Sequence, residues 1–306
     1  MEAPHAPSTT FLAHLDMKPL ARLSLALLGT AGLVGCKDDA PTFVNPGPQA
    51  YVRYVNASPD SPIVDARFVD LPENTRTFFG LAFRQNSGFY QAVNAGNRKL
   101  RVFLAGSAID STSTVVAEGD LNLAERTYYT IVQVGTVGSG LGRTNGNASF
   151  VLFTDTIPAA ADLAATDFRV RAYNLTSTGP INVEMARTVG TTTLATAQTA
   201  QNIPVNGRSP YVNLTRIQAA DTLFRFTVRQ PGAATALFNV APSGALDLGA
   251  PFTPASIASA PLEPIAGIRQ GRSVMSLFVF GAGTGRNATI TTGTATLLAD
   301  QNPPRP

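Results

Sequence analysis

The sequence contains an internal repeat, and this repeat restricts the chain to folds that can be built twice from one pattern. The segment Val52–Ser58 matches Val170–Thr176, and Arg126–Gly135 matches Arg272–Gly281 in the same order. A glycine-rich loop and a last strand-like segment follow the second match in both units. The repeat predicts two domains, at residues 50–156 and 167–301, with a linker at 157–166 and a tail at 302–306.

Short segments with alternating apolar and polar residues predict β-strands. Val64, Ala66 and Phe68 alternate with Asp65 and Arg67, which is the pattern of a strand with one buried face. Further strands are expected in the first unit at residues 52–55, 77–83, 88–93, 99–104, 113–117, 127–134 and 149–153. Turn residues separate nearly all of these segments, and no long stretch combines helical periodicity with capping residues. We therefore predict an all-β chain of two tandem antiparallel β-sandwich domains, Ig-like or barrel-like, arranged like two beads on a lipid-tethered string.

An apolar run directly before the only cysteine predicts a secretion signal. Lys18 and Arg22 give it a basic start, and the run from Leu23 to Val34 is shorter than the roughly 20 residues that a membrane-spanning helix needs. Gly35 supplies the small residue before the expected cleavage site. The alternative is a buried apolar segment with an incidental cysteine, but Cys36 stands at the position where the signal requires it.

The segment Leu33-Val34-Gly35-Cys36 resembles the lipobox of bacterial lipoproteins, in which the cysteine thiol is diacylglycerylated and the signal is removed before it. The resemblance implies that residues 1–35 are a signal region with its true start at Met17. It also implies that Cys36 carries a lipid anchor with fatty acyl chains such as palmitate, so that the membrane is a partner through this anchor. Residues 37–49 are rich in Pro and are expected to form a flexible spacer. The residue after the cysteine is lysine and not the aspartate of one known retention signal, which favours the outer membrane.

The residues that follow Cys36 exclude several classes of site. They contain no histidine and no tryptophan, and their only lysines are Lys37 and Lys99. Ser-His-Asp and Cys-His catalysis, His/Cys zinc sites, haem and iron–sulfur ligation are therefore excluded. The net charge is only +3 and no run of Lys or Arg occurs, so nucleic acid is not an expected partner. We expect no cofactor, no metal and no enzymatic activity.

The segment from Val52 to Asp65 reads V-R-Y-V-N-A-S-P-D-S-P-I-V-D. It resembles the opening of an exported bacterial family called domain of unknown function number 4397, whose units typically begin V-R-x-x-H-A-S-P-D-A-P-x-V-D, often occur in tandem and follow secretion signals. The second unit departs from this pattern, because Leu175–Gly179 replaces the Ala-Ser-Pro-Asp segment. The family's histidine is Asn56 in the first unit and Asn174 in the second. The resemblance implies two tandem copies of an exported β-rich module and brings no established activity.

The turn Ser58-Pro59-Asp60-Ser61-Pro62 is the most conspicuous local motif. Proline fixes φ, and serine and aspartate close turns through their side chains, so this composition predicts a rigid loop. The functional alternative makes Ser58, Asp60 and Asp65 a ligand loop, in which Asp60 contacts a ligand or gives an oxygen to Ca²⁺. No EF-hand spacing is present to support a specific calcium site.

Charged residues recur at matching places in the two units, Arg53 with Asp65 and Arg171 with Glu184. If the first two strands of each unit form a hairpin, these charges pair across it and contribute about 0.2–1 kcal/mol each. The functional alternative is a pair of carboxylates for glycoside cleavage, which requires two acidic side chains roughly 5–10 Å apart. The candidates for that pair are Asp60, Asp65 and Asp70.

The glycine loops at residues 138–143 and 281–286 are followed by another strand and carry an arginine, so we interpret them as flexible hairpin connections and not as phosphate loops. An aromatic cluster in the first unit is interpreted as core and inter-domain packing. Because consecutive residues of a strand point to opposite faces, one ring of the pair Phe78-Phe79 is expected to be exposed, where it could stack on a sugar or cover a partner. The cluster contains Phe78, Phe79, Phe83, Phe89 and Tyr90.

These features together predict a non-catalytic, exported protein, lipid-anchored in the bacterial cell envelope. Its two β modules are expected to bind or scaffold an envelope protein or a polysaccharide. The alternatives are a carboxylate-dependent glycan-acting enzyme and a purely structural surface spacer.

Overall fold

The computed structural model describes residues 47–71, 77–108, 114–138, 146–189, 192–215, 221–241, 250, 253 and 262–302. The predicted signal region, the lipobox with Leu33, Val34, Gly35 and Cys36, and most of the spacer and tail lie outside the described residues. The described residues are all β apart from two short 3-10 helices, η2 (Ala160–Asp162) and η3 (Gly285–Asn287), which confirms the predicted fold class. Neither of the helices in this part of the chain is long and apolar enough to cross a membrane.

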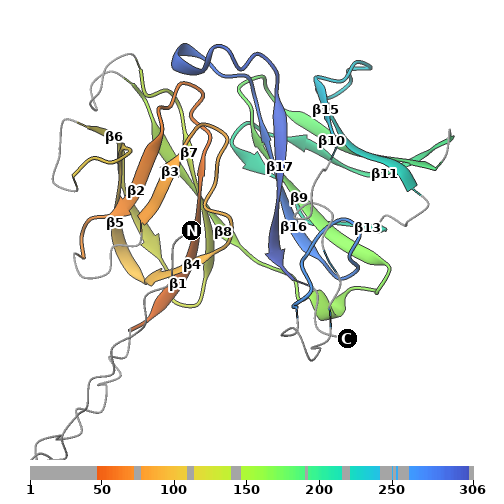
Figure 1. Ribbon diagram of the computed structural model, residues 1–306, viewed down its shortest axis with the longest axis horizontal. Coiled ribbons are helices and arrows are strands. Elements are labelled where there is room, and N and C mark those ends of the chain that lie inside the picture. The colour runs from red at the N-terminus through yellow and green to blue at the C-terminus, as the bar shows by residue number, and fades with distance from the viewer. Residues whose placement is uncertain are drawn as a thin grey trace, which may run out of the picture. The chain divides into compact units, whose positions relative to one another are not determined.

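The first β-sandwich consists of two four-stranded sheets (Figure 1). Sheet A has the strand order β4 (Gln91–Asn94), β1 (Gln49–Asn56), β7 (Tyr128–Val134) and β8 (Ser149–Asp155). Sheet B has the order β3 (Thr77–Leu81), β2 (Val64–Phe68), β5 (Gly96–Leu104) and β6 (Val115–Leu123). Each predicted strand of this unit overlaps one of these strands, and β1 takes in Gln49, the last residue of the predicted spacer.

The second β-sandwich repeats this plan. Sheet C has the order β12 (Gly207–Arg208), β9 (Asp167–Leu175), β16 (Val274–Phe280) and β17 (Thr294–Gln301), with β13 (Val212–Thr215) also paired to β9. Sheet D has the order β11 (Thr192–Ile203), β10 (Ile181–Val189), β14 (Asp221–Arg229) and β15 (Phe238–Val240).

The segments that match in the sequence occupy equivalent places in the two sandwiches. β1 runs parallel to β7 with Arg53 opposite Thr130, and β9 runs parallel to β16 with Arg171 opposite Ser276. These parallel pairs correct the prediction of purely antiparallel sandwiches. Parallel neighbours need a long crossover, and here the chain between β1 and β7 builds the whole of sheet B.

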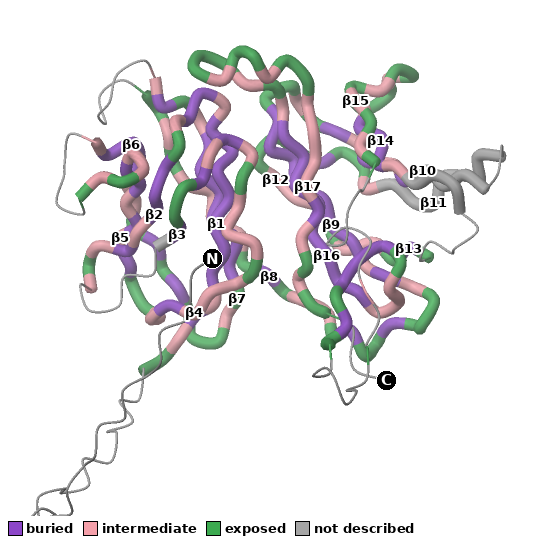
Figure 2. Tube along the Cα trace, viewed as in Figure 1, coloured by how far each residue is buried: buried purple, intermediate pink, exposed green. Residues whose placement is uncertain are grey.

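The two sandwiches pack face to face within one compact unit, Gly47–Pro306. The outward faces of sheets A and C share an apolar cluster that includes Val55, Val132, Tyr173 and Phe278. β16 is therefore buried at every position, between its own core on one side and sheet A on the other (Figure 2). The two sandwiches are therefore packed against each other and are not strung out like beads, because these central strands have two apolar faces and each face needs a partner.

The linker between the sandwiches is also packed. Ala160 in η2 and Leu163 just after it are buried against Val274 at the start of β16. The backbone N–H of Ala160 donates to Gln301, and the Arg272 side chain donates to the Leu163 carbonyl oxygen. The linker therefore fixes the end of sheet C.

Candidate functional site

The Ser58–Pro62 turn is built into the end of the first sandwich. The Asp60 carboxylate accepts hydrogen bonds from the backbone N–H groups of Val137 (2.8 Å) and Gly138 (2.7 Å), just after β7. The Ser58 hydroxyl accepts a hydrogen bond from Gln133, which in turn accepts one from the buried Tyr54 hydroxyl. These contacts give the side chains of Ser58 and Asp60 partners inside the fold.

Asp65, the third residue of the predicted ligand loop, lies on β2 and serves sheet B. Its carboxylate accepts hydrogen bonds from the N–H groups of Gly80 (2.8 Å) and Gly106 (3.0 Å) and pairs with Arg67 at 3.3 Å. Asp70 pairs with Arg98 at 2.8 Å. Within the described residues, no three acidic, histidine or cysteine side chains are placed to hold a metal ion.

The predicted cross-strand pairs, Arg53–Asp65 and Arg171–Glu184, are wrong. The first two strands of each unit belong to different sheets, so the two members of each pair lie on separate layers. Glu184 instead pairs with Arg229 at 3.1 Å on the neighbouring strand β14. The two arginines point out of their sheets into the interface between the sandwiches, where they meet different carboxylates.

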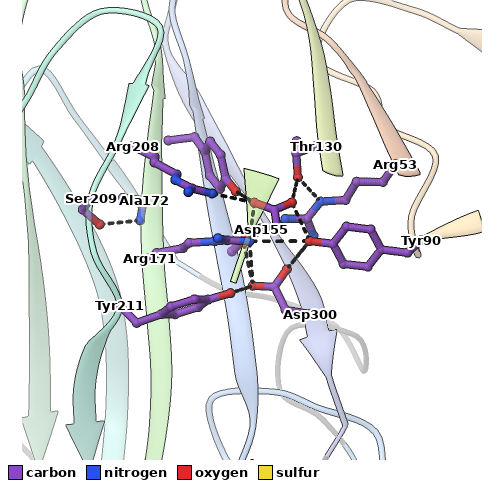
Figure 3. Close-up of polar contacts among 12 residues, drawn as sticks. Arg53, Tyr90, Thr130, Asp155, Arg171, Ala172, Arg208, Ser209, Tyr211 and Asp300 are labelled. Carbon is purple, nitrogen blue, oxygen red and sulfur yellow. Dashed lines mark hydrogen bonds and ion pairs between the residues drawn. The ribbon is translucent and has the colours of Figure 1, made fainter. Parts of the chain in front are cut away.

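The interface contains a reciprocal pair of ion pairs, which we call the ion network (Figure 3). Arg53 of the first sandwich lies 2.7 Å from Asp300 of the second. Arg171 of the second sandwich lies 2.9 Å from Asp155 of the first. The side chains of Arg53 and both aspartates are 0% exposed. Since the repeat aligns the two arginines and also the two aspartates, the network has the pattern of an isologous dimer interface.

Two hydroxyls connect the charges. Arg53 Nε donates to Thr130 Oγ1 at 2.8 Å, and Thr130 donates to Asp155. Arg171 Nε donates to Ser276 Oγ at 3.0 Å, and Ser276 donates to Asp300 at 2.7 Å. Each arginine is thus linked through a hydroxyl to the aspartate of its own sandwich, while it pairs directly with the aspartate of the other.

Three tyrosines and a third arginine complete the network. Tyr90 and Tyr173 each donate to Asp155 at 2.8 Å, and Arg208 pairs with it at 2.7 Å. Tyr211 donates to Asp300 at 2.6 Å. Both carboxylates are fully buried and therefore accept several charge-assisted hydrogen bonds at low local dielectric.

Burial governs the protonation of these groups. Burial is the largest single effect on Arg53 and disfavours its charged form, but the interactions with Asp300, Tyr90, Tyr173 and Asp155 together outweigh it and raise the pKa of Arg53 above its ordinary value. Burial raises the pKa of Tyr90, and burial followed by the charge of Asp300 raises the pKa of Tyr211. Burial and then Asp155 raise the pKa of Tyr173. The arginines are therefore charged and the tyrosines neutral at physiological pH, as the hydrogen bonds require.

A cavity of about 220 Å³ lies between the sandwiches, at the far end of the interface from the point where the chain enters β1. We call it the inter-sandwich cavity. Its floor consists of the buried side chains of Ala57, Phe83, Val134 and Leu175. Its mouth is formed by the exposed residues Thr136, Ser177, Val205, Asn206 and Ala282. The remaining described lining residues are Pro59, Gly135, Thr176 and Gly281.

The second glycine loop holds the sandwiches together beside this cavity. The Thr284 N–H donates to the Pro59 carbonyl oxygen at 2.9 Å, and Asn287 donates to the Ser61 carbonyl oxygen at 2.9 Å. Arg84, whose pKa is lowered by burial, donates to the Gly281 carbonyl oxygen. This loop is therefore docked on the first sandwich, which corrects its interpretation as a flexible connection. Most of its counterpart, residues 139–145, lies outside the described residues.

The aromatic cluster divides among several environments. Phe78 is buried in the first core and Phe79 is 68% exposed, as expected for consecutive strand residues. Phe83 lies in the cavity floor and Tyr90 in the ion network. Phe89 is 74% exposed. Interior and surface positions are thus both represented in the cluster.

The charged network and the cavity contain residues that the sequence did not single out. Tyr211, Arg208 and Val205 lie between β11 and β13, in a part of the chain whose sequence has no clear match in the first unit. Asp155 and Asp300 could have been found, because they are the only acidic residues at matching positions near the ends of both units. The repeat itself was the available signal.

Comparison with solved structures gives distant matches. The tip fimbrial protein Mfa3 from Porphyromonas gingivalis, solved with a C-terminal truncation, is 6% identical, with a TM-score of 0.24, over 82% of this chain and 100% of that chain. A candidate adhesin from Bacteroides ovatus is 10% identical, with a TM-score of 0.23, over 76% of this chain and 89% of that chain. At these scores neither structure carries an argument about function.

Comparison with curated proteins found no match. A family model described as Domain of unknown function (DUF4397) matches residues 50–186. The matched region covers the first sandwich and continues through β9 into β10. The chain therefore contains one DUF4397 domain, at residues 50–186.

Proposed function

We propose that this chain is a non-catalytic binding or scaffolding protein of the bacterial cell envelope, held to the membrane by a lipid on Cys36. In this proposal the second sandwich is a second copy of the module in the first. The repeated sequence, the shared strand order and the two equivalent parallel pairs support the second copy. The basic start, the apolar run and the lipobox-like segment support the anchor.

The observation that carries the proposal is the chemistry of the inter-sandwich cavity. Its thirteen described lining residues are all uncharged, and none is a tyrosine, an aspartate, a glutamate, an arginine or a lysine. General acid–base catalysis needs a group that exchanges a proton near the operating pH. Such a lining supports binding of a ligand without offering a group for catalysis.

The ion network supports a second part of the proposal, which is that the two modules act as one rigid body. A buried ion pair adds little net stability compared with an apolar pair of the same size, but losing one partner is costly because it leaves the other charge buried and unpaired. Reciprocal pairing of Arg53 with Asp300 and Arg171 with Asp155 favours one relative placement of the sandwiches. A cavity built from both modules keeps its shape only if that placement is kept.

The alternatives receive less support. A glycan-acting enzyme requires two carboxylates in one accessible cleft. The closely grouped carboxylates of Asp155 and Asp300 are fully buried and bound to arginine, and Asp60, Asp65 and Asp70 each have donors of their own. A purely structural spacer does not require a concave site, so the cavity counts against the spacer alternative.

In-cell crosslinking of the tagged full-length chain tests the proposal, with the captured material analysed for both protein and glycan. The Cys36→Ala variant is the control for the anchor, and we expect it to lose both membrane fractionation and labelling by an alkyne analogue of palmitate. The proposal expects one enriched protein or polysaccharide. Turnover of an envelope substrate by the purified chain, abolished by a single carboxylate substitution, would contradict it. Capture of nothing above background would favour the spacer.

A further inference from the structure

We propose that the inter-sandwich cavity binds one large apolar side chain from an extended, uncharged segment of a partner protein. This inference rests on the proposed binding function and names the site and the class of ligand. Three properties of the cavity lead to it: the division between floor and mouth, the absence of charge among its described lining residues, and its placement on the molecule.

The floor of the cavity accepts only an apolar group. Ala57, Phe83, Val134 and Leu175 supply carbon atoms and no polar side-chain atom. The buried Thr176 also lines the cavity, but its hydroxyl is already hydrogen-bonded to Asn174 and Thr178. A polar group that reached this depth would leave water without a replacement hydrogen bond, which is unfavourable. An aliphatic or aromatic side chain would instead bury its surface there favourably.

The mouth of the cavity is polar and neutral. Within the described residues, the side chains of Ser177 and Asn206 have no hydrogen-bond partner. A hydroxyl and an amide can each donate to and accept from the backbone of an extended peptide. The peptide backbone would then lie across the mouth while one of its side chains enters the floor. Neutral flanking residues fit best, because no described lining residue carries a charge that could pair with one on the ligand.

The division of the cavity into an apolar floor and a polar mouth also disfavours a sugar as the ligand. A sugar ring carries hydroxyls around its whole edge, so some of them would face the apolar floor without partners. Its usual support, an exposed aromatic face, is missing from the described lining, because Phe83 is buried and packs edge-on against Phe280. With a volume of about 220 Å³, the cavity is smaller than the ~300–1,000 Å³ typical of drug-sized ligands and suits a single side chain.

The cavity is well placed for a partner. The chain enters the first sandwich at the first residue of β1, and the cavity lies beyond the last residue of this strand. The eight residues of β1 span roughly 25 Å, so the cavity is separated from the entry point of the chain by about that length. The ion network and the docked loop fix its two walls before binding, so little ordering is required when a ligand enters.

The test uses residues 37–306, which contain the whole compact unit Gly47–Pro306. The probes are two capped peptides, acetyl-Ser-Gly-Leu-Gly-Ser-amide and its counterpart with alanine in place of leucine, together with the neutral disaccharide cellobiose. Binding is measured from the backbone amide signals of Gly135, Ser177 and Gly281 in NMR spectra. We expect the leucine peptide to shift these signals and to bind at least about tenfold more tightly than the alanine peptide, because it buries an isobutyl group where alanine buries a methyl.

Two variants block the cavity in different ways. Gly281→Val adds a side chain to the wall at a position where the φ angle is ordinary and a new Cβ would have its nearest contact at 3.5 Å, from Thr176. Val205→Asp puts a charge on an exposed position at the mouth. Both are expected to lose the tenfold preference for leucine. Phe79→Ala, on the outer face of sheet B, is the matched control and should keep it.

Each other outcome overturns the inference. If cellobiose shifts the cavity signals and the peptides do not, the site takes a sugar and the proposed binding function survives without the peptide. Equal binding of the leucine and alanine peptides, or no shift at millimolar peptide concentration, would show that the cavity does not recognise a large apolar side chain. If both blocked variants still capture a partner in cells, the protein binds through another surface. Capture of no partner by the unaltered chain is the separate result that would defeat the proposed function.

Discussion

Asp300→Asn is the change that most directly tests whether the ion network holds the two sandwiches together. The substitution keeps the shape of the side chain and its ability to accept hydrogen bonds from Ser276 and Tyr211. It removes the charge that faces Arg53 at 2.7 Å and Arg171 at 3.7 Å. The network would then contain three guanidinium groups and one carboxylate.

The expected loss follows from the burial of both partners. Arg53 and Asp300 have fully buried side chains, so the arginine cannot recover its hydration when the carboxylate is neutralised. Removing one partner from such a pair costs about 3–5 kcal/mol. The double variant Arg53→Met with Asp300→Asn removes both charges, and it should cost at least about 2 kcal/mol less than the sum of the two single variants.

Urea unfolding followed by circular dichroism measures these free energies. The control is Glu184→Gln, which breaks the pair with Arg229, where both side chains are 27% exposed. That pair is expected to contribute less than about 1 kcal/mol. If Asp300→Asn costs no more than Glu184→Gln, or if the double variant costs the full sum, the network is not a buried and coupled unit and the reasoning is wrong.

Three further predictions use matched positions. Asn56→Ala and Asn174→Ala should each destabilise the chain by about 1–3 kcal/mol in urea unfolding, because both buried amides hold backbone groups after the first strand of their sandwich; a large difference between them would contradict their equivalence. Gly135→Ala should lower the melting temperature clearly, since its φ is +79° and a Cβ would lie 2.5 Å from the Asn147 carbonyl oxygen, whereas Gly281→Ala should change it little. Burial raises the pKa of four of the seven tyrosines, so the folded state keeps these protons above pH 10 while the unfolded state loses them. Stability should be complete below that pH and fall by up to about 5 kcal/mol per pH unit above it; tyrosinate absorbance that rises for all seven before unfolding would refute this.

Most of the fold could be predicted from the sequence, because it depends on local patterns. Alternation over Val64–Phe68 and similar segments gave strands close to those of the structure, and turn residues gave their ends. Packing between the sandwiches was expected only from the aromatic cluster, although a stronger signal was present. Val274–Phe280 is apolar at nearly every position, which is typical of a strand that is buried on both faces. A sandwich that does not pack against another domain needs an apolar surface on only one face of each sheet.

The candidate site could be predicted only in part. The repeat aligns the arginines, the hydroxyl residues and the aspartates of the two units, so each member of the central network stands at a matched position. Those members are Arg53, Thr130 and Asp155 in the first unit and Arg171, Ser276 and Asp300 in the second. The pair Arg53–Asp300 joins residues 247 positions apart (300 − 53), and the pair Arg171–Asp155 depends on how the linker between them brings the two sandwiches together. No local pattern in the sequence encodes either contact.

The repeat also accounts for how one set of side chains can form both halves of the interface. When a face carries an arginine and an aspartate at suitable places, a copy turned by half a circle presents an aspartate to the arginine and an arginine to the aspartate. The charges at the centre follow this rule, and they are the same in both units. The cavity walls do not follow it, because Ala57 stands where the second unit has Leu175. Phe83 likewise stands where the second unit has Val205, since the next residues, Arg84 and Asn206, donate the same backbone hydrogen bond to Asn56 and Asn174. A large residue on one wall thus corresponds to a smaller one on the other. The shared charges hold the two modules in register, and the unequal walls leave between them an apolar space that neither module could form alone.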